Sequence, residues 1–149
     1  MTRGKKPREV IGWREWVGLP EFGIDVVKAK IDTGARTSAL HAFRLSTFTR
    51  DGQDWARFEI HPHQRTALDA ITVEAPVVDM RRVRSSNGEI QDRPVIRTDI
   101  VIQGHRWPIE ITLTSRDEMG FRILIGRAAI RRRFVVDPAR SFTGESDAP

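Results

Sequence analysis

The chain has 149 residues, 39% of them hydrophobic, which suits one globular domain with its own core. It contains no cysteine, and this excludes disulfide scaffolds, thiolate metal sites and cysteine nucleophiles. The 25 basic and 20 acidic residues give a formal net charge of +5, and the excess is spread along the sequence, unlike the concentrated basic stripe of a dedicated DNA-binding protein.

Short segments with alternating apolar and polar residues, separated by turn residues, predict an all-β barrel or sandwich. The expected strands, in chain order, are residues 9–17, 26–31, 45–49, 55–60, 71–83 with a break at Pro76, 89–98, 99–102, 107–113 and 123–126. Asp51-Gly52 and residues 85–88 are typical of hairpin turns. The short segment 127–133 is the expected helix.

The ends of the chain differ in composition from its middle. We expect a flexible basic arm at residues 1–8, a single domain at residues 9–142, and a disordered polar tail at residues 143–149. No stretch approaches the ~20 apolar residues of a membrane helix, and the apolar segment near the start is too short for a signal peptide. The sequence therefore predicts a soluble, cytoplasmic protein.

Two short motifs stand out, and each has an ordinary interpretation. Asp32-Thr33-Gly34-Ala35 follows an apolar strand, and it could be a simple turn in which Asp bonds the backbone and Gly takes a positive φ. About ninety residues later, the aliphatic run 123–125 precedes Gly126 and Arg127, and such a run is often a core strand with its terminating turn. Their occurrence together, in this order, is the more informative observation.

Further segments strengthen that observation and cover most of the chain: residues 11–15, 30–42, 83–88, 93–96, 113–119 and 136–142. From residue 9 to about 142, the sequence resembles a bacterial family of retropepsin-like aspartic proteases, often labelled RimK-type "ATP-dependent zinc protease". The resemblance implies a closed all-β retropepsin-like barrel with one short C-terminal helix. It also implies that the Asp32 loop and the segment ending at Gly126 cross beneath an active site, and that residues 83–90 form a hairpin flap.

The resemblance assigns roles to individual residues. The implied catalytic residues are Asp32, Thr33 and Gly34. The implied substrate-binding residues are Ala35, Arg36, Arg84, Ser85, Ser86, Asn87, Gly88 and Ile125. Two aspartates held close together cannot both ionise, so they share a proton, and one activates water while the other protonates the scissile peptide. One Asp-Thr-Gly supplies half of this dyad, and a twofold homodimer through the Asp32 loop would complete it.

Arginine at position 36 stands where viral retropepsins carry an acidic residue. If Arg36 and Arg84 face the cleft, they favour an acidic substrate such as a glutamate-modified protein. The family's association with ATP-grasp ligases that add glutamate suggests a functional link to such an enzyme. We expect an aspartic endopeptidase; the alternatives are a catalytically silent, monomeric peptide-binding module of the same fold and a basic RNA- or ribosome-associated protein.

The sequence does not favour a metal or another cofactor. His61-Pro62-His63 is the only paired-histidine motif, and the usual zinc-hydrolase and phosphate-binding-loop signatures do not occur. Arg81-Arg82 and Arg131-Arg132-Arg133 could hold phosphates, but solvated strand ends and a solvated helix face are the favoured interpretation. Without tyrosine, and with Trp and Phe mainly in apolar strand positions, no platform for stacking bases is evident. We therefore expect neither nucleic acid nor membrane as a partner.

Overall fold

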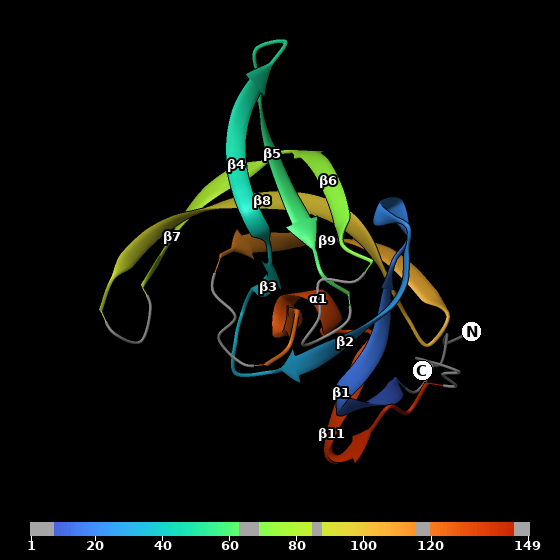
Figure 1. Cartoon of the computed structure of the whole chain (residues 1–149). Helices are drawn as coiled ribbons and strands as arrows, with labels where there is room; N and C mark the ends of the chain where they lie inside the picture. The colour runs from blue at the N-terminus through green and yellow to red at the C-terminus, as the bar shows by residue number, and fades with distance from the viewer. Residues whose placement is uncertain (1–7, 63–68, 85–87, 116–119, 145–149) are drawn as a thin grey trace, which may run out of the picture.

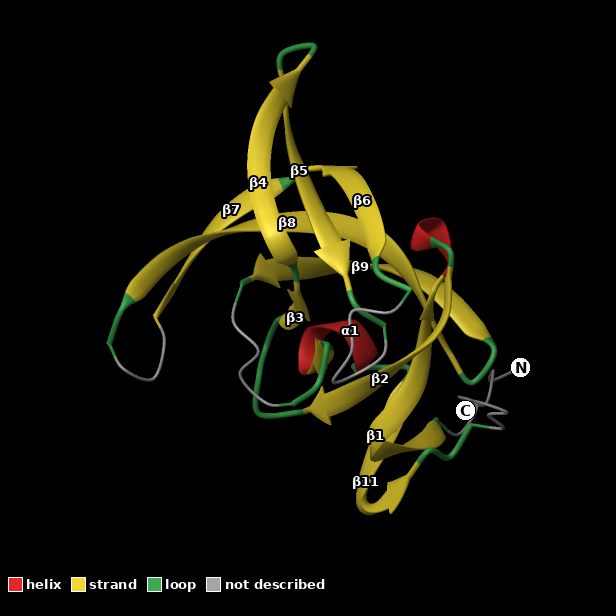
Figure 2. Ribbon diagram, in the orientation of Figure 1, coloured by secondary structure: helices red, strands yellow, loops and turns green. Residues whose placement is uncertain are grey.

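The computed structural model describes residues 8–62, 69–84, 88–115 and 120–144. Strands dominate these ranges (Figure 2). The strands are β1 (Glu9–Leu19), β2 (Ile24–Asp32), β3 (Ser38–His41), β4 (Phe43–Arg50), β5 (Gln53–Ile60), β6 (Ile71–Pro76), β7 (Asp79–Arg84), β8 (Ile90–Ile102), β9 (His105–Thr114), β10 (Ile123–Gly126) and β11 (Phe134–Ser141). Within the described residues, helical structure is limited to the 3₁₀ turn η1 (Pro20–Phe22) and the helix α1 (Arg127–Ile130).

The strands form two sheets. The larger has eight strands in the order β11-β1-β2-β10-β3-β9-β8-β7, and a further pairing of Gly18 in β1 with Val101 in β8 closes part of it into a ring. The smaller sheet has the order β4-β5-β6. The β4–β5 hairpin projects at the top of Figure 1, and β7 with the start of β8 projects to the left.

The fold class expected from the sequence is confirmed: the protein is all-β, with one short helix in its described part. The ring, however, is not a clean barrel. Among the described residues, β1 and β8 are joined by a single pair, Gly18 with Val101. The strands β11 and β7 lie at the two ends of the strand order, where β11 pairs with β1 and β7 pairs with β8. The ring is closed only partly, because β1 and β8 share one described residue pair and not a longer ladder.

Alternating burial along the strands builds one hydrophobic core across both sheets. Phe58 and Ile60 of the smaller sheet belong to the same buried cluster as Ile111 and Leu113 of β9. These four side chains are at most 1% exposed. The core therefore fixes the β4–β6 sheet against the ring.

Three details differ from the sequence-based expectation. The helix ends at Ile130, and not at residue 133, because Arg131 has a ψ of 141° and Arg132 a φ of 70°, and neither is helical. The short strand β3 and the strand β11 were not predicted. β11 runs parallel to β1 at the edge of the sheet, where Pro138 is tolerated because an edge strand has unpaired backbone groups.

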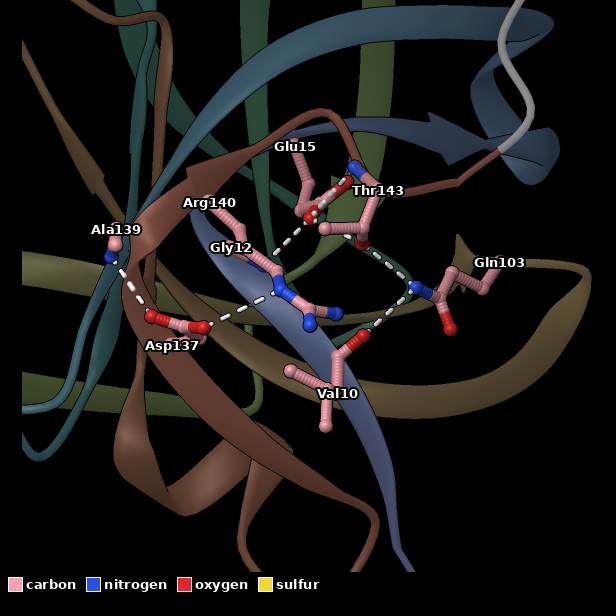
Figure 3. Close-up of polar contacts among 8 residues, drawn as sticks. All are labelled: Val10, Gly12, Glu15, Gln103, Asp137, Ala139, Arg140 and Thr143. Atoms are coloured by element: carbon pink, nitrogen blue, oxygen red, sulfur yellow. Dashed lines mark hydrogen bonds and ion pairs between the residues drawn. The ribbon is translucent and has the colours of Figure 1, made fainter.

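Contacts of the C-terminal segment extend beyond residue 142. The buried carboxylate of Glu15 accepts hydrogen bonds from the backbone N–H of Gly12 at 2.6 Å and from the hydroxyl and N–H of Thr143, the hydroxyl at 2.6 Å (Figure 3). It also accepts one from the N–H of Gly144. Gln103 links the same region by donating to the Val10 carbonyl and to Thr143. The first two residues of the predicted tail are therefore bonded to β1. Within the described residues, no helix is long and apolar enough to span a membrane.

Candidate active site

The loop that contains Asp32 begins where β2 ends. Val27, Ala29 and Ile31 of β2 are buried, so the strand is anchored up to the residue before Asp32. β10 runs parallel to β2, and their register pairs Gly126 with Asp32. The two motifs singled out in the sequence thus lie side by side in the structure.

The loop itself is a tight turn with an exposed surface. The N–H of Gly34 donates to Asp32 Oδ1 at 2.9 Å, and the N–H of Ala35 donates to the Asp32 carbonyl at 3.2 Å. The Asp-to-backbone bond of an ordinary turn is therefore present, but Gly34 lies outside the left-handed region, so the expected positive φ is wrong. A Cβ at Gly34 would lie 3.2 Å from Asp32 Oδ1, and glycine therefore lets the carboxylate approach the backbone. Asp32 is half-buried, and Thr33 and Gly34 are exposed.

The segment after β10 supports this loop from the other side. The N–H groups of Arg127 and Ala128, at the start of α1, donate to the carbonyls of Ala35 at 2.8 Å and Arg36 at 3.1 Å. The Arg127 guanidinium donates to the Gly34 carbonyl at 3.3 Å. These bonds fix the loop backbone on which Asp32 is presented.

Gly126 and Ser38 complete the support, and sequence reasoning had given Ser38 and Arg127 no role. A Cβ at Gly126 would lie 2.5 Å from the carbonyl carbon and oxygen of Thr37, so only glycine fits there. The N–H of Gly126 donates to the buried Ser38 Oγ at 3.0 Å. The only sequence signal for these roles was their proximity to the two motifs.

The predicted substrate-binding residues have different positions. Ala35 is half-buried, and Arg36 is exposed beside the catalytic loop. Ile125 is 0% exposed and belongs to the core, so its predicted contact with substrate stays a prediction without an exposed side chain to support it. Leu124, one residue earlier, is partly exposed because successive side chains of a strand point to opposite faces.

The strand pairing expected on either side of residues 85–88 is present, whereas their role as a flap stays a prediction. β7 and β8 pair in an antiparallel register that sets Arg84 opposite Ile90, and both side chains are exposed. Gly88 lies just before β8 with a φ of 86°. The other predicted flap residues, Ser85, Ser86 and Asn87, lie outside the described residues.

A cleft of about 820 Å³ opens beside the Asp32 loop. Its lining begins at Arg36, Thr37 and Ser38 and includes residues of β7, β9 and α1. The turn that follows α1 adds Arg131, Arg132 and Arg133. Basic residues that are far apart in the sequence therefore gather around one cavity.

The sequence profile of the RimB-like family, described as "Retropepsin-like aspartic endopeptidase RimB", matches residues 10–147. The chain belongs to this family. A solved structure of a Legionella pneumophila protein of unknown function is similar, with a TM-score of 0.78 and 26% identity, covering 93% of this chain and 100% of that one. The matched residues include both the Asp32 loop and the segment that ends at Gly126.

Relatives of this RimB-like chain carry a different name. The chain is 45% identical over 133 residues to a protein of Shewanella halifaxensis and 46% identical over 132 residues to one of Parasynechococcus marenigrum. Both are named "Probable alpha-L-glutamate ligase". The alignments cover 89% of this chain but 29% and 28% of those proteins, so the chain spans less than a third of their length.

The zinc in the family's older label requires a set of converging ligands, and the described residues do not supply one. His61 lies 3.3 Å from Glu59 and stacks on Phe43, whereas His105 contacts Glu9 at 3.0 Å. No three described histidine or acidic side chains are grouped so that they could hold a metal ion, and His63 lies outside the described residues. We therefore derive no chemical step through zinc.

Proposed function

We propose that this RimB-like chain is an aspartic endopeptidase whose catalytic dyad combines Asp32 of two copies. The observation that carries the proposal is the half-buried Asp32 carboxylate, which is oriented by Gly34 in an exposed loop. The sequence contains one Asp-Thr-Gly, so a second copy is the direct source of the partner carboxylate. Loop carbonyls fixed by Arg127 and Ala128 keep this geometry in place before the second copy binds.

The proposed chemistry needs only the two carboxylates and water. The ionised carboxylate takes a proton from water while the hydroxyl attacks the peptide carbonyl, and the protonated carboxylate gives its proton to the carbonyl oxygen. The resulting gem-diol collapses: one hydroxyl proton passes to the carboxylate that is now ionised, the C–N bond breaks, and the leaving nitrogen takes the proton that the other carboxylate received from water. The peptide is thereby hydrolysed and the shared proton is restored.

An acidic or glutamate-modified protein is the proposed substrate class, and a glutamate ligase of the ATP-grasp type is the proposed functional partner. Arg36 supports this choice because it is exposed four residues after Asp32. The names of the relatives support it as well, because a segment similar to this chain occurs within proteins named as glutamate ligases. The cytoplasmic location expected from the sequence belongs to the same proposal.

The test compares Asp32→Asn with Asp25→Asn, an exposed aspartate on the same strand. Cleavage of glutamate-rich, internally quenched peptides is followed by fluorescence, and the products are identified by mass spectrometry. Asp32→Asn removes both carboxylates of the dyad, because each copy supplies one, and should lower kcat/KM by at least about 10²–10⁴-fold, whereas Asp25→Asn should match the wild type. Excess Asp32→Asn protein should also suppress wild-type activity, because mixed dimers hold one intact dyad carboxylate.

Two results would overturn the proposal. Wild-type turnover by Asp32→Asn would exclude Asp32 as the catalytic group. Peptide binding without cleavage, at protein concentrations where sedimentation shows a dimer, would instead support the silent binding module.

A further inference from the structure

We propose that the arginine cleft, the cavity between the Asp32 loop, β7, β9 and the turn after α1, is a subsite that binds side-chain carboxylates of a peptide held in the catalytic loop. This inference rests on the proposed endopeptidase function and names the place where an acidic substrate is recognised. The volume of about 820 Å³ lies within the range of about 300–1,000 Å³ typical of ligand-binding clefts.

The charge of the cleft is strongly unbalanced. Its lining contains the arginines Arg36, Arg81, Arg131, Arg132 and Arg133. Among the described residues, Glu110 is the only acidic one in the lining, so they carry an excess of four positive charges, close to the +5 of the whole chain. Arginines that are separate in the sequence, and that are exposed at positions 36 and 131–133, therefore line one cavity.

Four of these arginines lack a compensating charge. Arg81 pairs with Glu110 at 2.5 Å. In the part of the chain that the structure describes, Arg36 and Arg131–Arg133 form no ion pair with a carboxylate, whereas arginines elsewhere, such as Arg50 and Arg106, do. Guanidinium groups bind carboxylates in a bidentate geometry, so unpaired arginines around one cavity are suited to an anionic ligand.

The turn after α1 presents its arginines in a conformation that suits glycine better. The N–H of Arg131 donates to the Arg127 carbonyl at 2.9 Å, and that of Arg133 donates to the Ile130 carbonyl at 3.0 Å. Between them, Arg132 has a φ of 70°, in a region that L-residues rarely adopt. These two backbone bonds hold the turn in the conformation that places its arginines at the cleft.

The distance between Asp32 and Arg36, at the edge of the cleft, can be spanned by a few residues of an extended peptide. The bond from the Ala35 N–H to the Asp32 carbonyl makes a turn that brings their Cα atoms within about 7 Å, and one more residue adds about 3.8 Å. Arg36 therefore lies within about 11 Å of Asp32 along the loop. An extended peptide rises about 3.3 Å per residue, so the cleft receives side chains from about three residues beyond the scissile bond.

The cleft is less suited to nucleic acid. Its one aromatic residue, Trp107, is 5% exposed. The Trp107 indole N–H donates to the Ala129 carbonyl, and Arg133 lies 4.7 Å above its ring. The ring is therefore covered and is not available to stack on bases.

The experiment measures binding, so that it is independent of turnover. The full chain carries Asp32→Asn in every sample, and fluorescence anisotropy follows labelled hexaglutamate, with hexaglutamine and hexauridylate as the other probes. Arg36→Gln combined with Arg132→Gly should weaken hexaglutamate binding at least tenfold. Glu110→Gln removes the acidic charge from the lining and leaves Arg81 paired with Asp79 alone, and it should tighten hexaglutamate binding about two- to fivefold. The matched control is Arg57→Gln, an exposed arginine on β5 outside the cleft, which should change nothing.

The melting temperature shows whether weaker binding comes from unfolding. Glycine adopts the left-handed conformation of residue 132 without strain, so Arg132→Gly should keep or raise the melting temperature of the protein. Unchanged hexaglutamate affinity in the double variant, or equal weakening by Arg57→Gln, would overturn the subsite. So would tighter binding of hexauridylate than of hexaglutamate, which would indicate a phosphate site. None of these results decides whether Asp32 is catalytic, because the cleavage assay tests that role separately.

Discussion

Replacing Gly126 with alanine tests whether the second motif positions the catalytic loop. The new Cβ would lie 2.5 Å from the Thr37 carbonyl carbon and oxygen and 2.8 Å from the Arg36 carbonyl oxygen. Ordinary Cβ contacts begin near 3.4 Å, so one strand must move by up to about 0.9 Å. All the atoms in the way belong to the backbone and cannot rotate aside. Gly126 pairs with Asp32, and the movement must therefore reach the catalytic loop.

The magnitude has two parts. Overpacking of this kind costs about 1–3 kcal/mol, which corresponds to a fall in melting temperature of about 3–10 °C for a domain of this size. A displacement near 1 Å at a catalytic group lowers kcat/KM by about 10²-fold. Calorimetry measures the first part, and the peptide-cleavage assay, run well below the melting temperature, measures the second. Gly144→Ala is the control, because its Cβ would meet only the Gln103 side chain at an ordinary 3.4 Å. Wild-type stability and activity in Gly126→Ala would refute the proposed coupling between the two motifs.

Two further predictions concern the C-terminal segment and metal dependence. Glu15→Gln should lower the free energy of unfolding by about 1–3 kcal/mol, because the buried carboxylate accepts four hydrogen bonds and an amide nitrogen cannot accept the one from Gly144. Denaturant titration measures this loss, and an unchanged midpoint would show that these bonds add nothing. Cleavage by the wild type should continue in a chelator and stop with a mimic that places a hydroxyl between the two Asp32 carboxylates. Activity lost in chelator and restored by zinc would contradict the dyad mechanism.

The sequence predicted the site's principal elements because each leaves a strong local signal. The alternation before Asp32 and the aliphatic run before Gly126 are both visible in the chain, and both are strands in the structure. The sequence did not show which side chains of β10 are buried. Three successive aliphatic residues carry no period, and β10 lies between β2 and β3, so the difference between Leu124 and Ile125 is set by tertiary packing.

Other parts of the fold left weak or misleading signals. Three successive arginines are good helix formers, so nothing in residues 127–133 indicated that α1 ends at Ile130 and that Arg132 turns left-handed. β11 contains Pro138 and several polar residues, which argue against a strand unless its place at the sheet edge is known. The grouping of Arg36 with Arg131–Arg133 likewise depends on strand order, which no local pattern encodes.

One short helix connects the two parts of the proposed site. The first residues of α1 donate to the carbonyls of Ala35 and Arg36, and the turn after its last residue carries the unpaired arginines. Four residues of α-helix rise only about 6 Å, so the arginine turn and the catalytic loop lie on one small rigid unit. A variant of the turn that acts through charge should raise KM and leave kcat unchanged, because the loop backbone is intact. A variant that tilts α1 should lower kcat as well, because the carbonyls that orient the Asp32 loop would then lose their donors.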